Sequence, residues 1–350
     1  MNQWSNKIRE WFRPTPSEYS ASLHIGNSCV VLLEFEINKE QVILLSVAQH
    51  RRVAQQTDEE IIKKIFNDNR LLGKNLSIAL SSDSGIARII NYPMMDEKQL
   101  RDSLSFQAEK YLPYAISDIY FDCQPIYIQT PKMASKQIKV LLVASKREAI
   151  AKSMELVKRS SYQLDVVNLA PIATINAFLS FLSKEDKKQT QILLDVGSKI
   201  THFSFFEEGN LSFIRDISYG TIDLMESLSK QLNISKSDAE KFLTEDVTEY
   251  DDNSKNILRK AIDKIMNEVQ LTMDYLEEQR ERPLSTKNMY IAGGISQNAL
   301  FVEAFEKNFS VSLKSWDPLK GVIVNPVIND EDLKLIKGVL PSAVGLALAK

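Results

Sequence analysis

The sequence predicts an α/β fold in which two related lobes enclose a cleft. The chain has 350 residues of ordinary globular composition, 44% hydrophobic and 25% charged, and single cores stop growing near ~250–300 residues. A strand, a glycine turn, a second strand, a turn and a third strand open both halves, with Gly26 and Gly197 in corresponding turns. The charged stretch SKEDKKQT, residues 183–190, has the composition of a linker between them. Two unrelated three-stranded meanders would give the same repeat, so the repeat alone leaves both interpretations open.

Strands and helices alternate through the first half. Apolar runs predict strands at residues 20–26, 27–36, 42–50, 75–82, 85–93, 118–128, 136–146 and 163–170. Helical periodicity predicts helices at residues 57–69, 96–112, 147–161 and 171–182. We expect Thr57 to cap the first of these helices and Pro113 to stop the second.

The second half opens with strands and then turns helical. Strands are expected at residues 191–197, 198–209, 210–218, 288–294 and 311–316, and helices at 237–245, 255–279, 298–307 and 340–350. The long helix carries an apolar stripe of Ile262, Ile265, Met266, Val269, Met273 and Leu276. We expect this stripe to pack in a core, although a coiled coil or a cofactor site would use similar spacing.

Composition excludes several classes of function. A net charge of -3 and a pI near 5.8, without a basic stripe, argue against a nucleic-acid binder. Cys29 and Cys123 have no CxxC or Cys/His neighbourhood, and the three histidines are scattered, so a zinc site is not expected. No apolar run reaches the ~18 residues of a membrane span, and the N-terminus lacks the apolar core of a signal peptide. We therefore expect a cytoplasmic protein.

The opening segment, residues 1–17, combines apolar and basic side chains. Trp4, Ile8 and Trp11 fall on one helical face, next to basic residues, and Pro14 ends the pattern. Such a short amphipathic helix could lie on an anionic membrane through residues 1–13. Docking on its own core or on a partner is the alternative, which the shortness of the helix narrowly favours.

Several segments resemble, in order, the PilM family of type IV pilus assembly proteins, and more distantly the cell-division protein FtsA. The most specific is residues 99–124, which resembles the family's helix–proline–strand signature. The residues that carry it are Gln107, Ala108, Glu109, Lys110, Tyr111 and Pro113. Five further segments match in sequence order: KVLLVASKREAI, LLDVGSKITHFSFFEEGNLSFIRDISYG, ISKSDAEKFL, YIAGGIS and PSAVGLALA. The resemblance covers about residues 20–350.

The resemblance implies an actin/Hsp70-like duplicated two-lobe fold with an FtsA-type αβ insertion. The first lobe would span residues 18–183, with the αβ insertion at about 86–163. The second would span residues 184–350, with a helical insertion at about 221–287 and a last helix, about 340–350, that packs back on the first lobe. In this family the N-terminal cytoplasmic tail of a membrane protein, PilN, docks beside the αβ module, so a PilN-like tail is the expected partner. Self-association is also compatible with the family.

The resemblance also implies a nucleotide site for ATP and Mg²⁺ between the lobes. Asp195, Gly197, Ser198 and Thr201 match the second phosphate turn, with Asp195 as a ligand that organises Mg²⁺. Glu240 matches a residue that contacts the ribose, and the pair Gly293 and Gly294 matches the adenosine turn. His24, Gly26 and Asn27 occupy the first phosphate turn.

Departures from the family pattern fall on groups that would touch nucleotide, Mg²⁺ or water. His24 stands where the family has Asp, and an imidazole cannot replace a hard oxygen ligand. Val31 and Leu243 stand where lysines are usual, and Asn168-Leu169-Ala170-Pro171 replaces a D-x-E-P pattern. We therefore expect a degenerate site in which ATP and Mg²⁺ binding is weak or lost, and no catalytic residue is assigned. The alternative is an altered but working site that uses His24.

Four functions compete on this basis. The first is a cytoplasmic scaffold or adaptor, peripheral to the inner membrane, in a type IV pilus or related secretion apparatus. An active ATPase or sugar-kinase-like enzyme would need a carboxylate in the first turn. An FtsA-like filament protein would continue into a membrane-targeting helix, and a GspL-like secretion protein into a membrane span, whereas this chain stops at LALAK. We therefore expect the scaffold.

Overall fold

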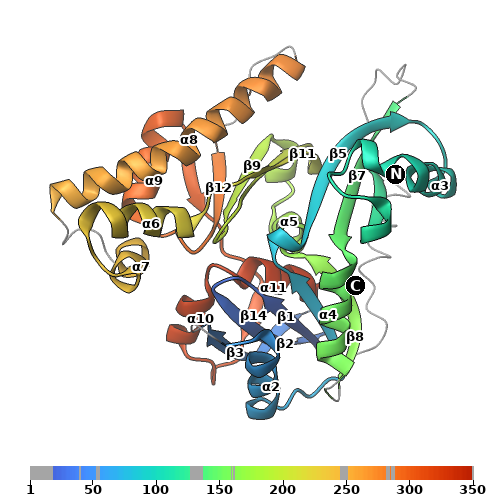
Figure 1. Cartoon of the computed structure of the whole chain (residues 1–350), viewed down its shortest axis with the longest axis horizontal. Coiled ribbons are helices and arrows are strands. Elements are labelled where there is room, and N and C mark those ends of the chain that lie inside the picture. Colours follow the sequence, from blue (N-terminus) through green and yellow to red (C-terminus); the bar gives the residue numbers. More distant parts are fainter. Residues whose placement is uncertain are drawn as a thin grey trace.

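Two large sheets, one in each lobe, organise the computed structural model shown in Figure 1. The structure describes residues 19–38, 41–52, 56–126, 137–158, 160, 162–244, 251–280, 284 and 288–348. The first sheet contains β1 (Tyr19–Ile25), β2 (Cys29–Ile37), β3 (Val42–Arg51), β4 (Asn75–Leu80), β8 (Gln163–Leu169) and β14 (Val322–Val324). The second contains β9 (Gln191–Val196), β10 (Thr201–Glu207), β11 (Asn210–Ile217), β12 (Asn288–Gly293) and β13 (Ser312–Ser315). The amphipathic helix expected at residues 1–17 lies outside the described residues.

Apart from the edge strand β14, the two sheets have the same strand order and the same strand directions. In the first, the order is β14-β3-β2-β1-β4-β8, and in the second it is β11-β10-β9-β12-β13. In both, the first three strands in sequence are antiparallel neighbours, and the next two add in parallel beside the first strand. Unrelated meanders would not share these parallel additions. The duplication is therefore a property of the whole sheets, and the predicted two-lobed α/β fold is confirmed.

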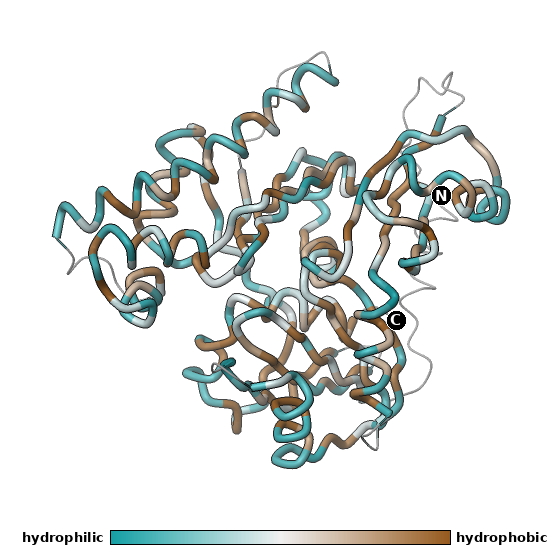
Figure 2. Tube along the Cα trace, viewed as in Figure 1, coloured by the Kyte–Doolittle hydropathy of each residue, from teal (hydrophilic) through white to brown (hydrophobic). Residues whose placement is uncertain are grey.

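Helices pack on both large sheets and on a third, smaller sheet. They are α2 (Asp58–Asp68), α3 (Glu97–Gln107), α4 (Arg147–Lys158), α5 (Ala170–Phe181), α6 (Thr221–Leu232), α7 (Lys236–Thr244), α8 (Asp252–Arg280), α9 (Ala299–Phe309), α10 (Asp330–Ile336) and α11 (Leu340–Ala347). Hydrophobic residues follow the strands of each lobe, whereas the outer ends of the peripheral helices are mostly hydrophilic (Figure 2). No helix in the described ranges is both long enough and apolar enough to cross a membrane.

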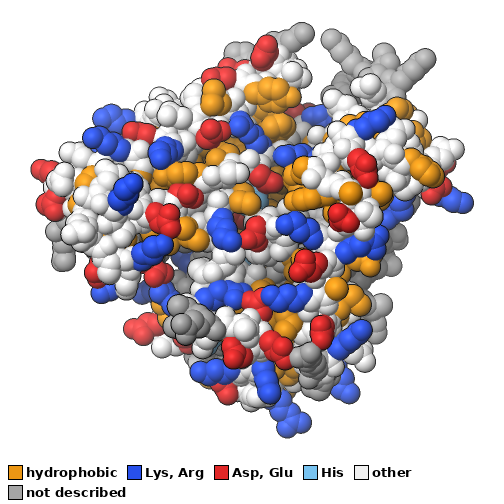
Figure 3. All heavy atoms as spheres, in the orientation of Figure 1, with side chains coloured by type: hydrophobic (Ala, Val, Ile, Leu, Met, Phe, Trp, Pro, Cys, Tyr) orange, Lys and Arg blue, Asp and Glu red, His pale blue; other side chains and the backbone are white. Residues whose placement is uncertain are grey.

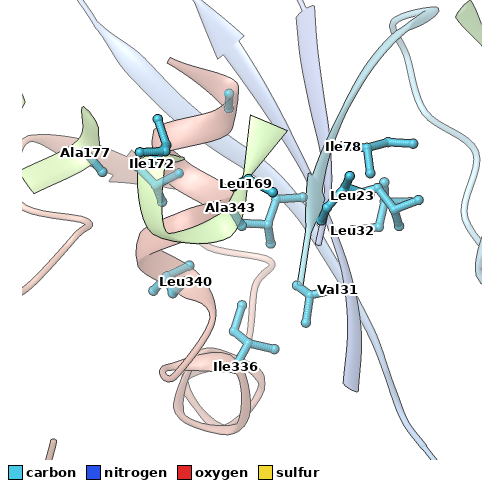
Figure 4. Packing of buried hydrophobic residues seen from close by; sticks show 14 of the residues in the cluster. Leu23, Val31, Leu32, Ile78, Leu169, Ile172, Ala177, Ile336, Leu340 and Ala343 are labelled. Carbon is cyan, nitrogen blue, oxygen red and sulfur yellow. The ribbon is translucent and has the colours of Figure 1, made fainter. Parts of the chain in front are cut away.

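The core of the first lobe covers both faces of its sheet. Leu23, Leu32 and Ile78 lie on one face, and Ile172 of α5 and Ala343 of α11 lie on the other (Figure 4). The two helices touch closely, because a β-carbon built on Gly345 would lie 1.8 Å from the carbonyl oxygen of Ala173. Glycine permits this approach because it has no side chain. The C-terminal helix is thus built into the first lobe.

An aromatic cluster joins the lobes. Phe178 of α5 is fully buried, and its ring centroid lies 5.2 Å from that of Phe206, 5.0 Å from Tyr290 and 5.4 Å from Trp316. All three partners belong to the second lobe. The other face of the second sheet packs on α6, α7, α8 and α9, where the predicted apolar stripe of α8 contributes Ile262, Ile265 and Val269 to the core.

A small module has a sheet of its own and touches the second lobe. Its antiparallel sheet has the order β5-β7-β6, formed by β5 (Gly85–Pro93), β6 (Ile119–Ile126) and β7 (Gln137–Lys146). The contact with the second lobe is made where β5 and β7 meet β11. Helix α3 packs on this sheet around a separate core that includes Leu100, Leu104 and Ile119. Residues 99–124, the segment most similar to the PilM signature, lie in this module and not in a lobe sheet.

The ends of two helices can be compared with the capping and stop signals expected from the sequence. Thr57 caps α2, where its hydroxyl accepts from the N–H of Glu60 while the Glu60 carboxylate accepts from the Thr57 N–H. The helix predicted over residues 96–112 is α-helical only to Gln107 and then tightens into a 3-10 turn, residues 108–110. Three elements were not predicted individually: α6, β14 and α10.

Candidate functional site

The first glycine turn joins β1 to β2. The N–H of Gly26 donates to the carbonyl of Cys29 at 3.0 Å, which closes the turn around Asn27. A β-carbon on Gly26 would lie 2.8 Å from Nε2 of His24. The imidazole therefore lies directly against the turn, and a side chain at position 26 would displace it.

His24 is held as a buried neutral side chain. Its Nδ1 lies 2.8 Å from Oγ of Ser342, and that hydroxyl donates to the carbonyl of Val339 at 2.9 Å. Because the single hydroxyl proton is used there, Ser342 accepts from Nδ1–H, which leaves Nε2 as an acceptor beside Gly26. Burial, and next the positive charge of Arg52, lower the pKa of His24 to about 4.

Two consecutive arginines at the end of β3 return to this turn. The Arg52 Nε–H donates to the Gly26 carbonyl at 2.7 Å, and its Nη1 lies 2.5 Å from Oδ1 of Asp58. Asp58 also binds Lys152 of α4. The carboxylate pKa of Asp58 is lowered, because hydrogen bonds from Lys152 and Arg52 outweigh the effect of burial. A fixed guanidinium thus lies at the first turn.

Arg51 reaches across to the second lobe. Its Nη1 lies 3.3 Å from Oε1 of Glu240 on α7. Both side chains are well exposed, at 56% for Arg51 and 43% for Glu240, so this pair contributes only ~0–1 kcal/mol. Glu240, the expected ribose contact, therefore lies near the first turn and pairs with a cation of the first lobe.

The second glycine turn joins β9 to β10 and is tied to α6. The N–H of Gly197 donates to the Ile200 carbonyl at 3.1 Å, while the carbonyls of Gly197 and Ser198 accept from Thr221 and Ile222 at the start of α6. These bonds occupy the first N–H groups of α6. The hydroxyl of Thr201 is buried and donates to the Tyr219 carbonyl at 2.7 Å, so it stabilises the base of the turn.

Asp195 lies at the end of β9, directly before this turn. Burial raises the pKa of its carboxyl group, although the nearby His202 and a hydrogen bond from Thr174 act in the opposite direction. Asp195 is partly exposed. Asp195 is the residue that the resemblance to the family implies as a ligand of Mg²⁺.

The third glycine turn follows β12. Gly293 has a φ of 95°, and a β-carbon there would lie 2.1 Å from the Val196 carbonyl, whereas a β-carbon on Gly294 would meet nothing within 4 Å. The turn before α11 covers one side of this pair, because a β-carbon on Gly338 would lie 2.7 Å from the Gly294 nitrogen. Since Ser342 of α11 also holds His24, this C-terminal segment joins the first and third turns.

Further contacts between the lobes lie beside the second turn. Ser82, which follows β4, has its Oγ 2.6 Å from Nε2 of His202, and the His202 Nδ1 lies 2.7 Å from Oδ1 of Asp216. Lys199 in the turn lies 3.0 Å from Asp83. These polar contacts hold the end of the first sheet against the second hairpin.

Three of the departures from the family pattern are uncharged side chains. Val31 and Leu243 are buried, at 0% and 3%, in the cores of the first and second lobes. The amide of Asn168 accepts from the following N–H of Leu169 at 2.8 Å. None of the three supplies a charged group to the glycine turns.

The residues around the first turn do not fit a Mg²⁺ ion. Mg²⁺ needs hard oxygen ligands in octahedral geometry, but the side chain at the first turn is a neutral imidazole and the Gly26 carbonyl accepts from Arg52. Within the described ranges, no group of three or more His, Cys, Asp or Glu side chains could hold a metal ion. Among the residues expected at the phosphate turns, Asp195 is the one that carries a carboxylate.

The predicted residues come together in two groups. His24, Gly26 and Asn27 lie at the first turn with Glu240 nearby through Arg51, and Asp195, Gly197 and Ser198 lie at the second turn next to the Gly293–Gly294 turn. Sequence reasoning missed Arg51, Arg52 and Ser342. A hollow lined by Arg259, Asp263 and Glu303 lies elsewhere, between α8 and α9, and contains none of the predicted site residues.

Comparisons with known proteins identify the family to which the chain belongs. Residues 33–350 match the model of the family described as type IV pilus assembly protein PilM. A solved structure of a PilM-PilN type IV pilus biogenesis complex is similar with a TM-score of 0.81 at 22% identity, over 95% of this chain and 98% of that one. The ethanolamine utilization protein EutJ from Carboxydothermus hydrogenoformans is similar with a TM-score of 0.55 at 14% identity, over 98% and 94%. The chain therefore belongs to the PilM family of type IV pilus assembly proteins.

Proposed function

We propose that the chain is a cytoplasmic scaffold of a type IV pilus or related secretion apparatus, peripheral to the inner membrane. In this role it binds the N-terminal cytoplasmic tail of a PilN-like membrane protein. Family membership and the similarity to a PilM-PilN complex support this proposal. The observation that carries it is the separate αβ module, which has its own core and presents apolar side chains to solvent on both sides.

The proposed docking surface is the β6 edge of the module sheet, on the face opposite α3. Along β6, Ile119 points into the module core, so the neighbouring Tyr120 points to the other face and is 51% exposed. The guanidinium of Arg147 on α4 lies 4.1 Å from the centroid of the Tyr120 ring. Met154 lies two turns further along the same face of α4 and is 43% exposed. These three residues form an apolar surface with one cation that suits a short apolar tail.

The site between the lobes does not hydrolyse ATP with Mg²⁺ in this proposal. The neutral imidazole of His24 and the guanidinium of Arg52 offer no oxygen ligand to a divalent cation at the first turn. An active ATPase of the same superfamily is the alternative function, and it requires a carboxylate and a metal at this turn. Release of phosphate from Mg-ATP by the purified chain would favour that alternative.

The docking surface is tested with a peptide of the N-terminal cytoplasmic tail of a PilN-like membrane protein. Tyr120→Ala and Met154→Glu should each weaken binding by about 30-fold, as expected for central interface residues. Phe106→Glu is the matched control, because Phe106 is 89% exposed on α3, on the other side of the module sheet. Loss of binding with the control variant alone would move the site to α3, and wild-type protein that captures no tail would refute the adaptor role.

A further inference from the structure

We propose that residues 1–13 of one copy of the chain dock on the C-terminal half of α8 in a second copy, so that the chain associates head to tail. The docking surface on α8 is defined by the exposed side chains of Leu271 and Tyr275. This contact lies in the second lobe and is independent of tail binding by the module.

Two large apolar side chains are exposed on one face of α8. Leu271 is 57% exposed and Tyr275 is 48% exposed, and residues four apart on a helix lie next to each other. The ring centroid of Tyr275 lies 5.8 Å from that of Phe213 on β11, so the apolar surface continues from the helix toward the neighbouring strand. Hydrophobic side chains reach the surface over the upper end of α8, with acidic side chains beside them (Figure 3).

The same half of α8 is acidic. Residues 265–279 contain no Lys or Arg and four acidic side chains, which are Glu268, Asp274, Glu277 and Glu278. Arg215 of β11 lies 2.9 Å from the first of these. Asp274 follows Leu271 by three residues and Glu278 follows Tyr275 by three, so each exposed apolar side chain has an exposed carboxylate beside it. This surface therefore suits an apolar partner that carries positive charge.

The sequence of residues 1–13 has this combination of properties. Its apolar side chains recur at the spacing of one helical face, and they include Trp4, Ile8 and Trp11. Its basic side chains outnumber the single acidic one, Glu10, and are Lys7, Arg9 and Arg13. The indole rings can cover the apolar face of α8 while the basic groups meet its carboxylates, and such opposite charges select one partner over others.

The exposed aromatic rings of the module match this segment less well. The charged group that lies against Tyr120 is the guanidinium of Arg147, 4.1 Å from the ring centroid, and it would repel a basic segment. Phe106 on α3 is 89% exposed, with Asp102 and Lys110 four residues away on either side. Opposite charges at equal spacing give a basic segment no preference for that ring, so charge favours α8.

The segment of the same chain is too short to reach α8. Five residues, 14–18, separate it from Tyr19, where β1 begins, and five residues span at most about 18 Å. β1 has seven residues, which makes it about 23 Å long, and it leads from Tyr19 to the first glycine turn between the lobes. α8 lies further away, on the far side of the second sheet from the first lobe (Figure 1). Docking therefore joins two copies through different surfaces, and such a contact repeats from copy to copy.

The test measures self-association of the full chain by sedimentation equilibrium over a range of protein concentrations. The wild type should form species larger than a monomer as its concentration rises. Leu271→Glu and Trp11→Glu should each weaken this association by about 30-fold, as expected for central interface residues. Leu335→Glu is the matched control, because Leu335 is a leucine that is 51% exposed on another helix, α10, and this variant should associate as the wild type does. Wild-type midpoints in urea unfolding establish that the variants are folded.

A mixture of two variants tests the head-to-tail arrangement. Trp11→Glu keeps the surface on α8 and Leu271→Glu keeps the segment, so together they can make one contact and should form a dimer and nothing larger. A wild type that stays monomeric up to its solubility limit, a Leu271→Glu variant that associates like the wild type, or a mixture without dimer would overturn the proposal. A monomeric wild type that binds phosphatidylglycerol vesicles through residues 1–13 would also contradict it and would assign the segment to the membrane. Leu271→Glu should bind the tail peptide as the wild type does, so a failure of tail binding concerns the module alone.

Discussion

Acid should destabilise the first lobe through His24, and Asn in its place should remove this effect. The folded pKa of His24 is lowered from 6.5 to about 4, so the unfolded chain binds a proton that the folded chain excludes. Stability is therefore complete above pH 6.5 and falls as the pH drops toward 4. The full effect is about 3 kcal/mol, from ~1.4 kcal/mol per pKa unit, and about 2 kcal/mol of it is lost between pH 7 and pH 5.

The assay compares urea unfolding of the wild type and His24→Asn at pH 7 and pH 5. Asn is chosen because its side-chain amide can donate to Ser342 as the imidazole Nδ1–H does. All other ionisable groups are the same in both proteins, so the difference between the two pH-dependent losses isolates His24. The wild type should lose about 2 kcal/mol more than the variant. Equal acid losses, or a His24 ring that titrates near pH 6.5 by NMR, would refute the reasoning.

Three further predictions concern packing and reactivity. Gly345→Val should lower stability by about 3 kcal/mol or more in urea unfolding, because its β-carbon would lie 1.8 Å from the Ala173 carbonyl; Gly294→Ala, which enters open space, is the control and should unfold near the wild-type midpoint. Phe178→Ala should cost about 3–5 kcal/mol by the same assay, since Phe178 is buried against three aromatic rings of the second lobe, and a loss below ~1 kcal/mol would contradict that role. Burial raises the pKa of the Cys29 thiol, so iodoacetamide should alkylate it more slowly at pH 8 than free cysteine, and an equal rate would be the contrary result.

The duplicated fold could be predicted because its signals are local. Apolar runs separated by Gly26 and Gly197 define the two hairpins, and each strand within them needs only its near neighbours in sequence. The elements that were not predicted individually depend on distant contacts. The three-residue strand β14 exists because it pairs in parallel with β3, and α10 is a helix of seven residues that buries Ile336 in the first core. Short segments of this kind carry too few residues for periodicity to be recognised.

The residues of the candidate site also differ in whether the sequence alone could have identified them. The glycine turns were visible because glycine at a hairpin is a local signal. Arg52 could also have been found, since the antiparallel pairing of β2 with β3 sets Arg51 opposite Cys29 and so returns the end of β3 to the first turn. The contact between His24 and Ser342 spans 318 residues, and no pattern in the sequence connects them. Pairs that are made by tertiary packing are therefore visible only in the structure.

The residues at the first turn that depart from the family pattern are explained together by the charges around position 24. A carboxylate at position 24 would lie near the Arg52 guanidinium, which would favour its ionised form. Arg52 instead lies between the Gly26 carbonyl and Asp58, and Asp58 lies between Arg52 and Lys152. The carboxylate beside the first turn therefore belongs to Asp58, which already pairs with two cations, while the imidazole of His24 is neutral. Because the charges around the turn pair within the protein, a neutral side chain at position 24 is accounted for by its surroundings.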